Sequence, residues 1–225
     1  MGNFEKDFKL FASDRGVSST LMNDYQNVIS SQYIEPYIME ERQRNIAQIS
    51  VFSRMFMERI LFLGTEINSD VANIINSQLL YLEMDNPNKP ITMYINSPGG
   101  SVYDGMSIYD VTKFISCPIH TTCLGTAASM AAVLLSSGDK GHRYALPHSQ
   151  IMLHSPSGGT GRVTSPDFKI AAKEMEKCET MLYNVLAENM ETDYETIKNM
   201  CDRDFWMTPE EAVNLKVIDE IIKRK

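Results

Sequence analysis

Regular alternation of strand-like and helix-like segments constrains the fold of this chain more than any other feature. Short apolar runs occupy residues 59–64, 90–97 and 117–125, and a segment with helical spacing of apolar residues follows each run. Those helical segments are residues 68–87, 103–115 and 129–138. Because strand–helix–strand units form right-handed crossovers, three such units in about eighty residues predict an α/β fold with a largely parallel sheet.

Two of the predicted strand-to-helix turns carry residues suited to chemistry. Ligand and catalytic groups of parallel sheets gather at the carboxyl ends of the strands. The sequence SPGGS (97–101) lies at one such end, and Ser129 lies at the next. Ser129 also stands among four alanines within three residues of it, so close helix packing is the structural alternative to a nucleophile.

A serine hydroxyl is a useful nucleophile only when a neighbouring base accepts its proton and an acid orients that base. The chain has 4 histidines. We expect His120, in the middle of a predicted strand, to be packed or paired, and His142 and His148 to be solvated. His154 ends the apolar run QIML, at a strand end equivalent to that of Ser129, and is the candidate base.

The acid of such a set is sought in the run CDRDFWMTPEEAV (201–213). Phe205 and Trp206 follow Asp204 directly, and we expect these rings to shield its carboxylate in part, which would help it to orient an imidazole. In the alternative, Asp202 and Asp204 are the solvated approach to the following helix. From the residues alone, the choice between the two aspartates stays open.

Composition disfavours several classes of function. The 225 residues carry a formal net charge of −8, whereas nucleic acid and anionic lipid both require a basic surface. No apolar run has the form of a signal peptide or the length of a membrane span, so we expect a cytoplasmic protein. The 4 cysteines lack CxxC or Cys/His ligand spacing, so we expect reduced thiols and no metal site. No GxxxxGK[ST] phosphate loop occurs, so we expect this chain to bind no nucleotide.

A long helix is predicted in the C-terminal third. The glycine-rich run GGTGRVTSP (158–166) leads into it, with Ser165 as the expected N-cap and Pro166 in the first turn. An apolar stripe from Phe168 continues to about Met190, which gives a length of about 37 Å at 1.5 Å per residue. We expect a partner subunit to cover this stripe; its own sheet is the alternative. Nearer the N-terminus, we expect the charged stretch Glu40–Gln48 to be a mobile loop or the start of a helix.

Three blocks of sequence resemble, in order, the proteolytic subunits of the caseinolytic Clp protease (the ClpP family). They are YINSPGGSV (94–102), GTAASMAAVLLSSGDKGHRYALPHSQIMLH (125–154) and DRDFWMTPEEAVNLKVIDEII (202–222). The resemblance implies a peptidase domain at 46–225 with the ClpP/crotonase-like fold, a repeated ββα (βαβ) superhelix with a protruding long helix, the handle, at about 155–190. Residues 1–45 would be an N-terminal extension or axial region, which could be removed by proteolytic processing.

The resemblance also implies roles for individual residues. Ser129 is the implied nucleophile, His154 the general base and then general acid, and Asp204 the orienting acid. The implied oxyanion donors are the backbone N–H groups of Gly100 and Met130. The implied contacts to other subunits are the inter-ring pair, Asp202 and Arg203, and the ATPase docking residues, Leu80, Tyr94 and Phe114. For the docking residues, ordinary core packing is the alternative.

For the assembly, the resemblance implies a homo-oligomer of two stacked heptameric rings, a tetradecamer, that cuts unfolded or misfolded proteins into short peptides. A Clp-type AAA+ unfoldase such as ClpX, ClpA or ClpC would use the ATP, and this chain would need no cofactor. The chain departs from the family pattern at Ser155, where glutamine is usual, and by one extra residue in the glycine-rich run. The alternatives are a crotonase-like acyl-CoA hydratase or isomerase and a catalytically silent ring subunit.

Overall fold

The computed structural model describes residues 37–42, 45–159, 161 and 164–223. The chain divides into two compact units, Met1–Arg59 and Ile60–Lys225, which are described separately. Most of the predicted N-terminal extension therefore lies outside the described residues.

The first unit contains a two-stranded antiparallel pair. Strand β1 (Tyr37–Arg42) pairs with β2 (Asn45–Ser50), and helix α3 (Val51–Met57) follows directly. The prediction of a loop or a helix start at Glu40–Gln48 was wrong for the described part of that stretch. Cross-strand hydrogen bonds organise these residues, and a charged local sequence does not reveal such a partner.

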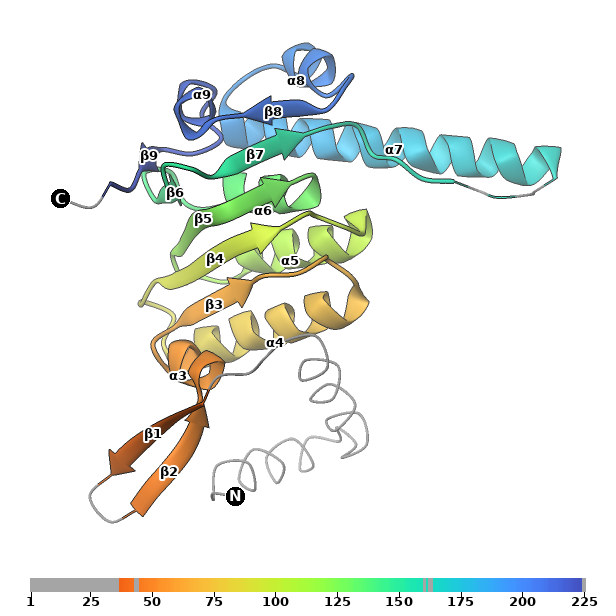
Figure 1. Cartoon of the computed structure of the whole chain (residues 1–225). Helices are drawn as coiled ribbons and strands as arrows, with labels where there is room; N and C mark the ends of the chain where they lie inside the picture. Colours follow the sequence, from red (N-terminus) through yellow and green to blue (C-terminus); the bar gives the residue numbers. More distant parts are fainter. Residues whose placement is uncertain (1–36, 43–44, 160, 162–163, 224–225) are drawn as a thin grey trace. The chain divides into compact units, whose positions relative to one another are not determined.

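The described part of the second unit is built around a seven-stranded sheet (Figure 1). Its main path runs β3-β4-β5-β6-β9, and a second branch leads from β5 to β7 and β8. Among the described strands of this sheet, only β7 and β8 pair in antiparallel fashion. The predicted α/β class with a largely parallel sheet is confirmed. The strands are β3 (Ile60–Leu63), β4 (Ile91–Ser97), β5 (Ile119–Ala128), β6 (Arg143–Ala145), β7 (Gln150–Leu153), β8 (Phe205–Met207) and β9 (Glu220–Ile221).

Helices α4 (Ser69–Asp85), α5 (Val102–Phe114) and α6 (Met130–Ser136) connect the parallel strands and lie on one face of the sheet (Figure 1). Successive right-handed crossovers between neighbouring strands place each helix on the same side. Asn68 caps the start of helix α4, and its side chain accepts a hydrogen bond from the N–H of Val71. Its sheet-facing positions, three or four residues apart, are buried: Ala72, Ile75, Leu79 and Leu82.

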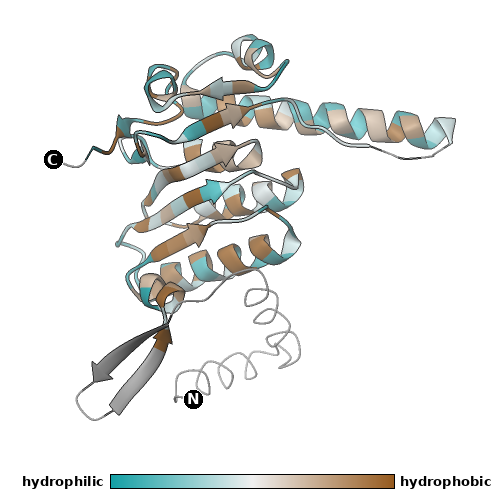
Figure 2. Ribbon diagram, viewed as in Figure 1, coloured by the Kyte–Doolittle hydropathy of each residue, from teal (hydrophilic) through white to brown (hydrophobic). Residues whose placement is uncertain are grey.

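The core lies between this sheet and these helices. Alternate residues of the central strands point toward the helices and are buried, and Figure 2 shows the corresponding hydrophobic bands on β3 and β4. These inward residues are Leu61, Leu63, Ile91, Met93, Ile95, Ile119 and Cys123. Each fully buried aliphatic side chain contributes about 1.5 to 3 kcal/mol relative to exposure. All four cysteines are buried free thiols, as the sequence predicts.

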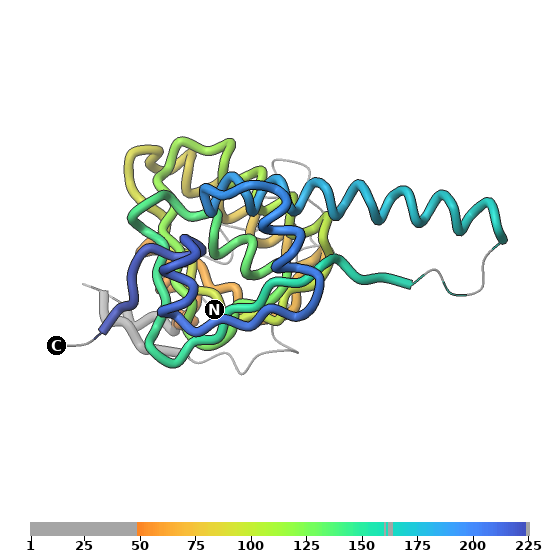
Figure 3. The backbone as a smooth tube through the Cα atoms, turned by 90° about the horizontal axis from the view of Figure 1, so that it is seen from above, coloured from red at the N-terminus to blue at the C-terminus, as the bar shows by residue number. Residues whose placement is uncertain are grey.

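Helix α7 (Ser165–Met190) is the predicted long helix, and its first half extends beyond the rest of the second unit (Figures 1 and 3). Phe168 and Ile170, in that half, are exposed, whereas Leu182 and Leu186, in the other half, are buried. Its own chain therefore covers only the C-terminal part of the apolar stripe. The prediction of Ser165 as N-cap was wrong: Thr164, with an extended backbone, occupies that position, and Ser165 is the first residue of the helix. Pro166 lies in the first turn, as predicted.

The remaining elements return the chain to the strand ends that carry the predicted site. Asp193 caps helix α8 (Tyr194–Met200), and its side chain accepts a hydrogen bond from the N–H of Thr196. The chain then enters β8, which pairs with β7, and continues into α9 (Pro209–Asn214). Among the described residues, no helix is both long and apolar enough to cross a membrane.

Candidate active site

Ser129 lies at the sharp turn between β5 and α6, as the N-cap residue of that helix. Its backbone has φ 55° and ψ −127°, a conformation that glycine adopts readily and other residues rarely do. The turn is held from the other side, because the N–H of Ser129 donates to the carbonyl oxygen of Met152 in β7, 2.8 Å away. Such strain persists only where surrounding structure enforces it, and it presents the Ser129 side chain at the strand end.

His154 follows β7 directly and lies beside Ser129. Its Nε2 atom is 2.8 Å from Ser129 Oγ, which is hydrogen-bonding distance. The parallel pairing of β5 with β7 brings these two strand ends together, since Ala128 pairs with Met152. The other histidines behave as the sequence suggests: the His120 ring stacks on His142 at 4.1 Å, and both His142 and His148 are exposed.

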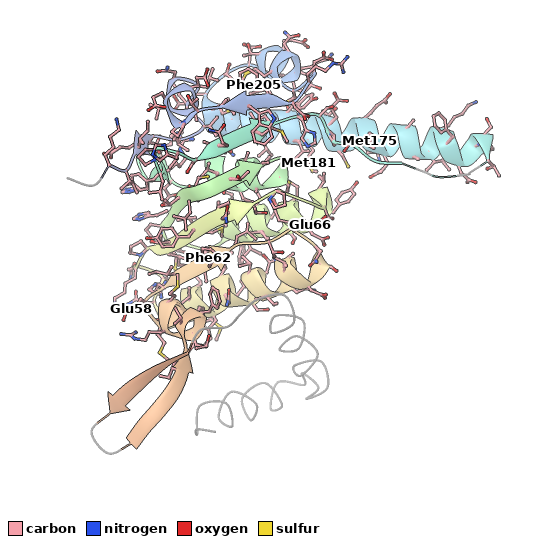
Figure 4. The ribbon with its side chains drawn as sticks, viewed as in Figure 1. Glu58, Phe62, Glu66, Met175, Met181 and Phe205 are labelled. Carbon is pink, nitrogen blue, oxygen red and sulfur yellow. The ribbon has the colours of Figure 1, made fainter. Side chains whose placement is uncertain are left out.

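Asp204 is the aspartate that the structure places near His154. Its Oδ1 atom lies 3.7 Å from His154 Nδ1, an ion-pair distance that is too long for a hydrogen bond. The Asp204 side chain is 66% exposed, so the expected shielding by the two rings is wrong. Strand β8 is short and pairs only with β7 among the described strands, so Trp206 is exposed and Phe205 (labelled in Figure 4) only half-buried. Asp202 instead lies 4.0 Å from the Nε atom of Arg203.

The glycine turn after β4 lies against the Ser129 turn. A Cβ on Gly99 would come within 2.7 Å of Ser129 Cβ and 2.9 Å of the Met130 nitrogen, so only glycine permits this approach. Gly100 pairs with Ile67 through bonds made by its two neighbours: the Ile67 N–H donates to Gly99 O, and the Ser101 N–H donates to Ile67 O. The N–H of Gly100 therefore points away from Ile67.

A small apolar pocket opens beside Ser129 and His154. Its wall comes from α5, α6, β7 and α7, and its apolar lining residues are Val102, Met130, Val133, Leu153, Leu182 and Leu186. Tyr183, which also lines it, is buried, and burial is the main cause that raises the pKa of its phenol. No local sequence pattern indicates this pocket, although Leu182 and Leu186 belong to the predicted apolar stripe.

The residues predicted to contact other subunits are not part of the Ser129–His154 pair. Phe114 is 80% exposed and Leu80 41% exposed, so core packing does not account for either, whereas Tyr94 is half-buried on the sheet face opposite the helices. Arg203 and Asp202 are both exposed. Among the described residues, no group of three or more His, Cys, Asp or Glu side chains is arranged to hold a metal ion.

Comparisons with known proteins place the chain in one family. The family model described as Clp protease matches residues 42–225. An ATP-dependent Clp protease proteolytic subunit of Bacteroides thetaiotaomicron is 47% identical over 97% of this chain and 99% of its own length. A protein of the same name from Porphyromonas gingivalis is 47% identical over 97% of this chain and 98% of its own. The ATP-dependent Clp protease proteolytic subunit 1 of Prochlorococcus marinus is 47% identical over 84% and 97%. Fold, family match and relatives agree that this chain belongs to the Clp protease family and is a serine-type peptidase.

Proposed function

We propose that Ser129 attacks the peptide bond and that His154 is its base. The observation that carries this proposal is the 2.8 Å separation between Ser129 Oγ and His154 Nε2. Transfer of the hydroxyl proton to Nε2 makes Oγ a nucleophile, which forms a bond to the scissile carbonyl carbon. The resulting imidazolium then gives the proton to the leaving amine, and an acyl-enzyme on Ser129 remains. Water, activated by the same imidazole, releases the acyl group and restores Ser129.

In this proposal Asp204 orients His154. A carboxylate on the Nδ1 side favours the tautomer that carries a proton on Nδ1 and leaves Nε2 free to accept one. The 3.7 Å distance supports an electrostatic contact, and such contacts in free enzymes shorten when substrate is bound.

Gly100 and Met130 supply the proposed oxyanion donors. Met130 is the first residue of α6, so its N–H has no acceptor within the helix, and the N–H of Gly100 points away from the Ile67 ladder. The Gly99 turn lies against Ser129 and the Met130 nitrogen, which supports a shared role for the Gly100 and Met130 amides. Loss of one such donor costs about 3 to 4 kcal/mol of transition-state stabilisation.

The apolar pocket suggests which peptides this site prefers. It adjoins Ser129 and His154 and is lined by aliphatic side chains from α6 and α7. Burial of an apolar substrate side chain there would hold the neighbouring carbonyl at Oγ. We therefore propose cleavage next to an apolar residue.

We further propose that the chain is the proteolytic subunit of a cytoplasmic, ATP-dependent assembly in which a separate AAA+ unfoldase uses the ATP. The names of the relatives describe proteolytic subunits of an ATP-dependent protease. Serine, histidine and aspartate suffice for acyl transfer, so we propose no cofactor in this chain. Unfolding a substrate costs about 5 to 15 kcal/mol, and a peptidase site offers no means to couple ATP to that step. The exposed Leu80 and Phe114, with Tyr94, are the proposed docking residues.

This division of labour predicts which substrates the chain can degrade alone. Given ATP but no unfoldase, we expect it to cut short fluorogenic peptides and to leave a stable folded protein intact. Addition of a Clp-type ATPase from the same source should start degradation of the folded protein, measured as loss of the intact band over time. An ATPase whose ATP hydrolysis is blocked is the control. Efficient degradation of the folded protein without any ATPase would contradict the proposal.

Two stacked heptameric rings are the proposed assembly, with the exposed half of α7 and the exposed Asp202–Arg203 pair at the contact between rings. We expect Arg203→Ala to weaken that contact and to lower peptidase activity with it, because Asp202 loses the cation beside it. Light scattering measures the mass of the assembly, and Lys223→Ala, an exposed cation outside α7, is the control for loss of a surface cation. A fully active monomer would rule out this arrangement.

A further inference from the structure

We propose that Asn96 is a positioning residue for the hydrolytic reaction, because its side chain holds the end of β5 that leads to Ser129. The inference rests on the proposed role of Ser129. Asn96 lies in β4, and its Oδ1 atom accepts a hydrogen bond from the backbone N–H of Thr126 in β5, 3.0 Å away. The Asn96 side chain thus accepts a hydrogen bond that a backbone carbonyl accepts in a regular strand pair.

The register between β4 and β5 shifts at Asn96. Ile95 pairs with Cys123 and Ser97 pairs with Ala127, so the single residue Asn96 faces three residues of β5. Extra residues in one strand interrupt the regular ladder, and the interrupted backbone groups need other partners. The Asn96 amide supplies one of them, and the glycine in the bulge makes room for it: a Cβ on Gly125 would lie 2.6 Å from Asn96 Oδ1.

The bulge changes the partner of β5. Before it, residues 121–123 pair with β6; after it, residues 126–128 pair with β7. These last three residues lead directly to Ser129, whose N–H continues the same ladder to Met152. The Asn96–Thr126 hydrogen bond therefore ties β4 to the first residue of the segment that sets Ser129 beside His154.

The residue after Asn96 supports the glycine turn. The next residue, Ser97, accepts a hydrogen bond from the N–H of Gly99 at 3.1 Å and donates its own hydroxyl to the carbonyl oxygen of Thr65. Two consecutive residues of β4, Asn96 and Ser97, thus support the segment that leads to Ser129 and the turn that carries the proposed oxyanion donor. Asn96 sets the distance between the nucleophile and Gly100. An error of about 1 Å in such a distance is enough to cost roughly 100-fold in rate.

The test compares Asn96→Ala with Asn96→Asp, which keeps an oxygen that can accept from the Thr126 N–H. Asn86→Ala is the matched control: Asn86 also accepts a backbone N–H, that of Asn88, but at the end of α4. Three measurements are made on the full chain. They are steady-state kinetics (kcat and KM) with a short fluorogenic peptide, the rate at which a fluorophosphonate labels Ser129, and amide hydrogen exchange of the segment that contains Thr126.

For Asn96→Ala we expect kcat and the labelling rate to fall about tenfold, with KM within about twofold, and exchange at Thr126 to become faster. Asn96→Asp should restore most of the kcat and the slow exchange, and Asn86→Ala should match the wild type. Unchanged kcat and labelling in Asn96→Ala, or an equal loss in Asn96→Asp with protected Thr126, would overturn the positioning role. A wild-type chain that neither cleaves nor labels would instead contradict the proposed function, and the positioning role with it.

Discussion

Replacement of Ser129 by alanine lowers the rate of peptide hydrolysis by about 10⁴-fold or more, because no other oxygen at this turn can form the acyl-enzyme. Fluorophosphonate labelling should disappear as well. The protein should remain folded, since one oxygen is removed from a site where His154 is half-buried and keeps access to water. Hydrolysis of a fluorogenic peptide, with circular dichroism to check the fold, measures both results. Activity near the wild-type level would remove Ser129 from the mechanism.

Two further variants separate chemistry from backbone strain. Ser129→Gly should be equally inactive but about 1 kcal/mol more stable than Ser129→Ala, because glycine accepts φ 55° and ψ −127° without strain. Ser155→Ala should keep most of the activity, since this neighbouring serine lies one residue beyond the base. Equal stability of the glycine and alanine variants would mean that the Ser129 turn stores no strain.

Replacement of Asp219 by alanine lowers the free energy of unfolding by about 3 kcal/mol or more, because it leaves Arg143 buried without its counter-charge. The Arg143 side chain is only 4% exposed. Its guanidinium donates to Asp219 Oδ1 at 2.6 Å and Oδ2 at 2.9 Å, and also to the carbonyl oxygen of Asn189 at the end of α7. The pair therefore joins β6, α7 and the approach to β9. A fall in melting temperature of roughly 10 °C would accompany the loss.

The difference in stability between the wild type and Asp219→Ala should become smaller at acidic pH. Burial alone would raise the pKa of Asp219, but the hydrogen bonds and the charge of Arg143 outweigh it and hold the pKa below its ordinary value of 3.8. The ionised Asp219 carboxylate therefore contributes its full share to the free energy of unfolding above pH 3.8. This share is lost as the pH falls through the lower pKa of the folded state. Denaturant titrations at neutral pH and near pH 3 should show a smaller gap between wild type and Asp219→Ala at the lower pH. Glu220→Ala, exposed and adjacent, is the control, and it should change stability by less than about 0.5 kcal/mol.

Local sequence was sufficient for the order and kind of the central elements. The strand–helix alternation from Arg59 to Ser137 predicts β3 through α6, because apolar periodicity and caps such as Asn68 act within a few residues. Prediction from local patterns failed where the residues that stabilise a segment are distant in sequence. The charged stretch that becomes β1 and β2 owes its conformation to cross-strand pairing, which no local pattern announces.

The sequence by itself determined the residue types of the candidate site and their order along the chain: Ser129 after one strand, His154 after another, and an aspartate before two rings. Only the tertiary structure decided how they meet. The β5–β7 pairing sets the 2.8 Å contact between serine and histidine, and the pairing of β8 with β7 leaves Asp204 exposed at 3.7 Å. The apolar pocket and the Asn96–Thr126 hydrogen bond likewise could not be predicted from the sequence. The reason is physical: periodicity reports which side of an element is buried, whereas distances between side chains depend on strand register and on bulges, which are set by contacts far apart in sequence.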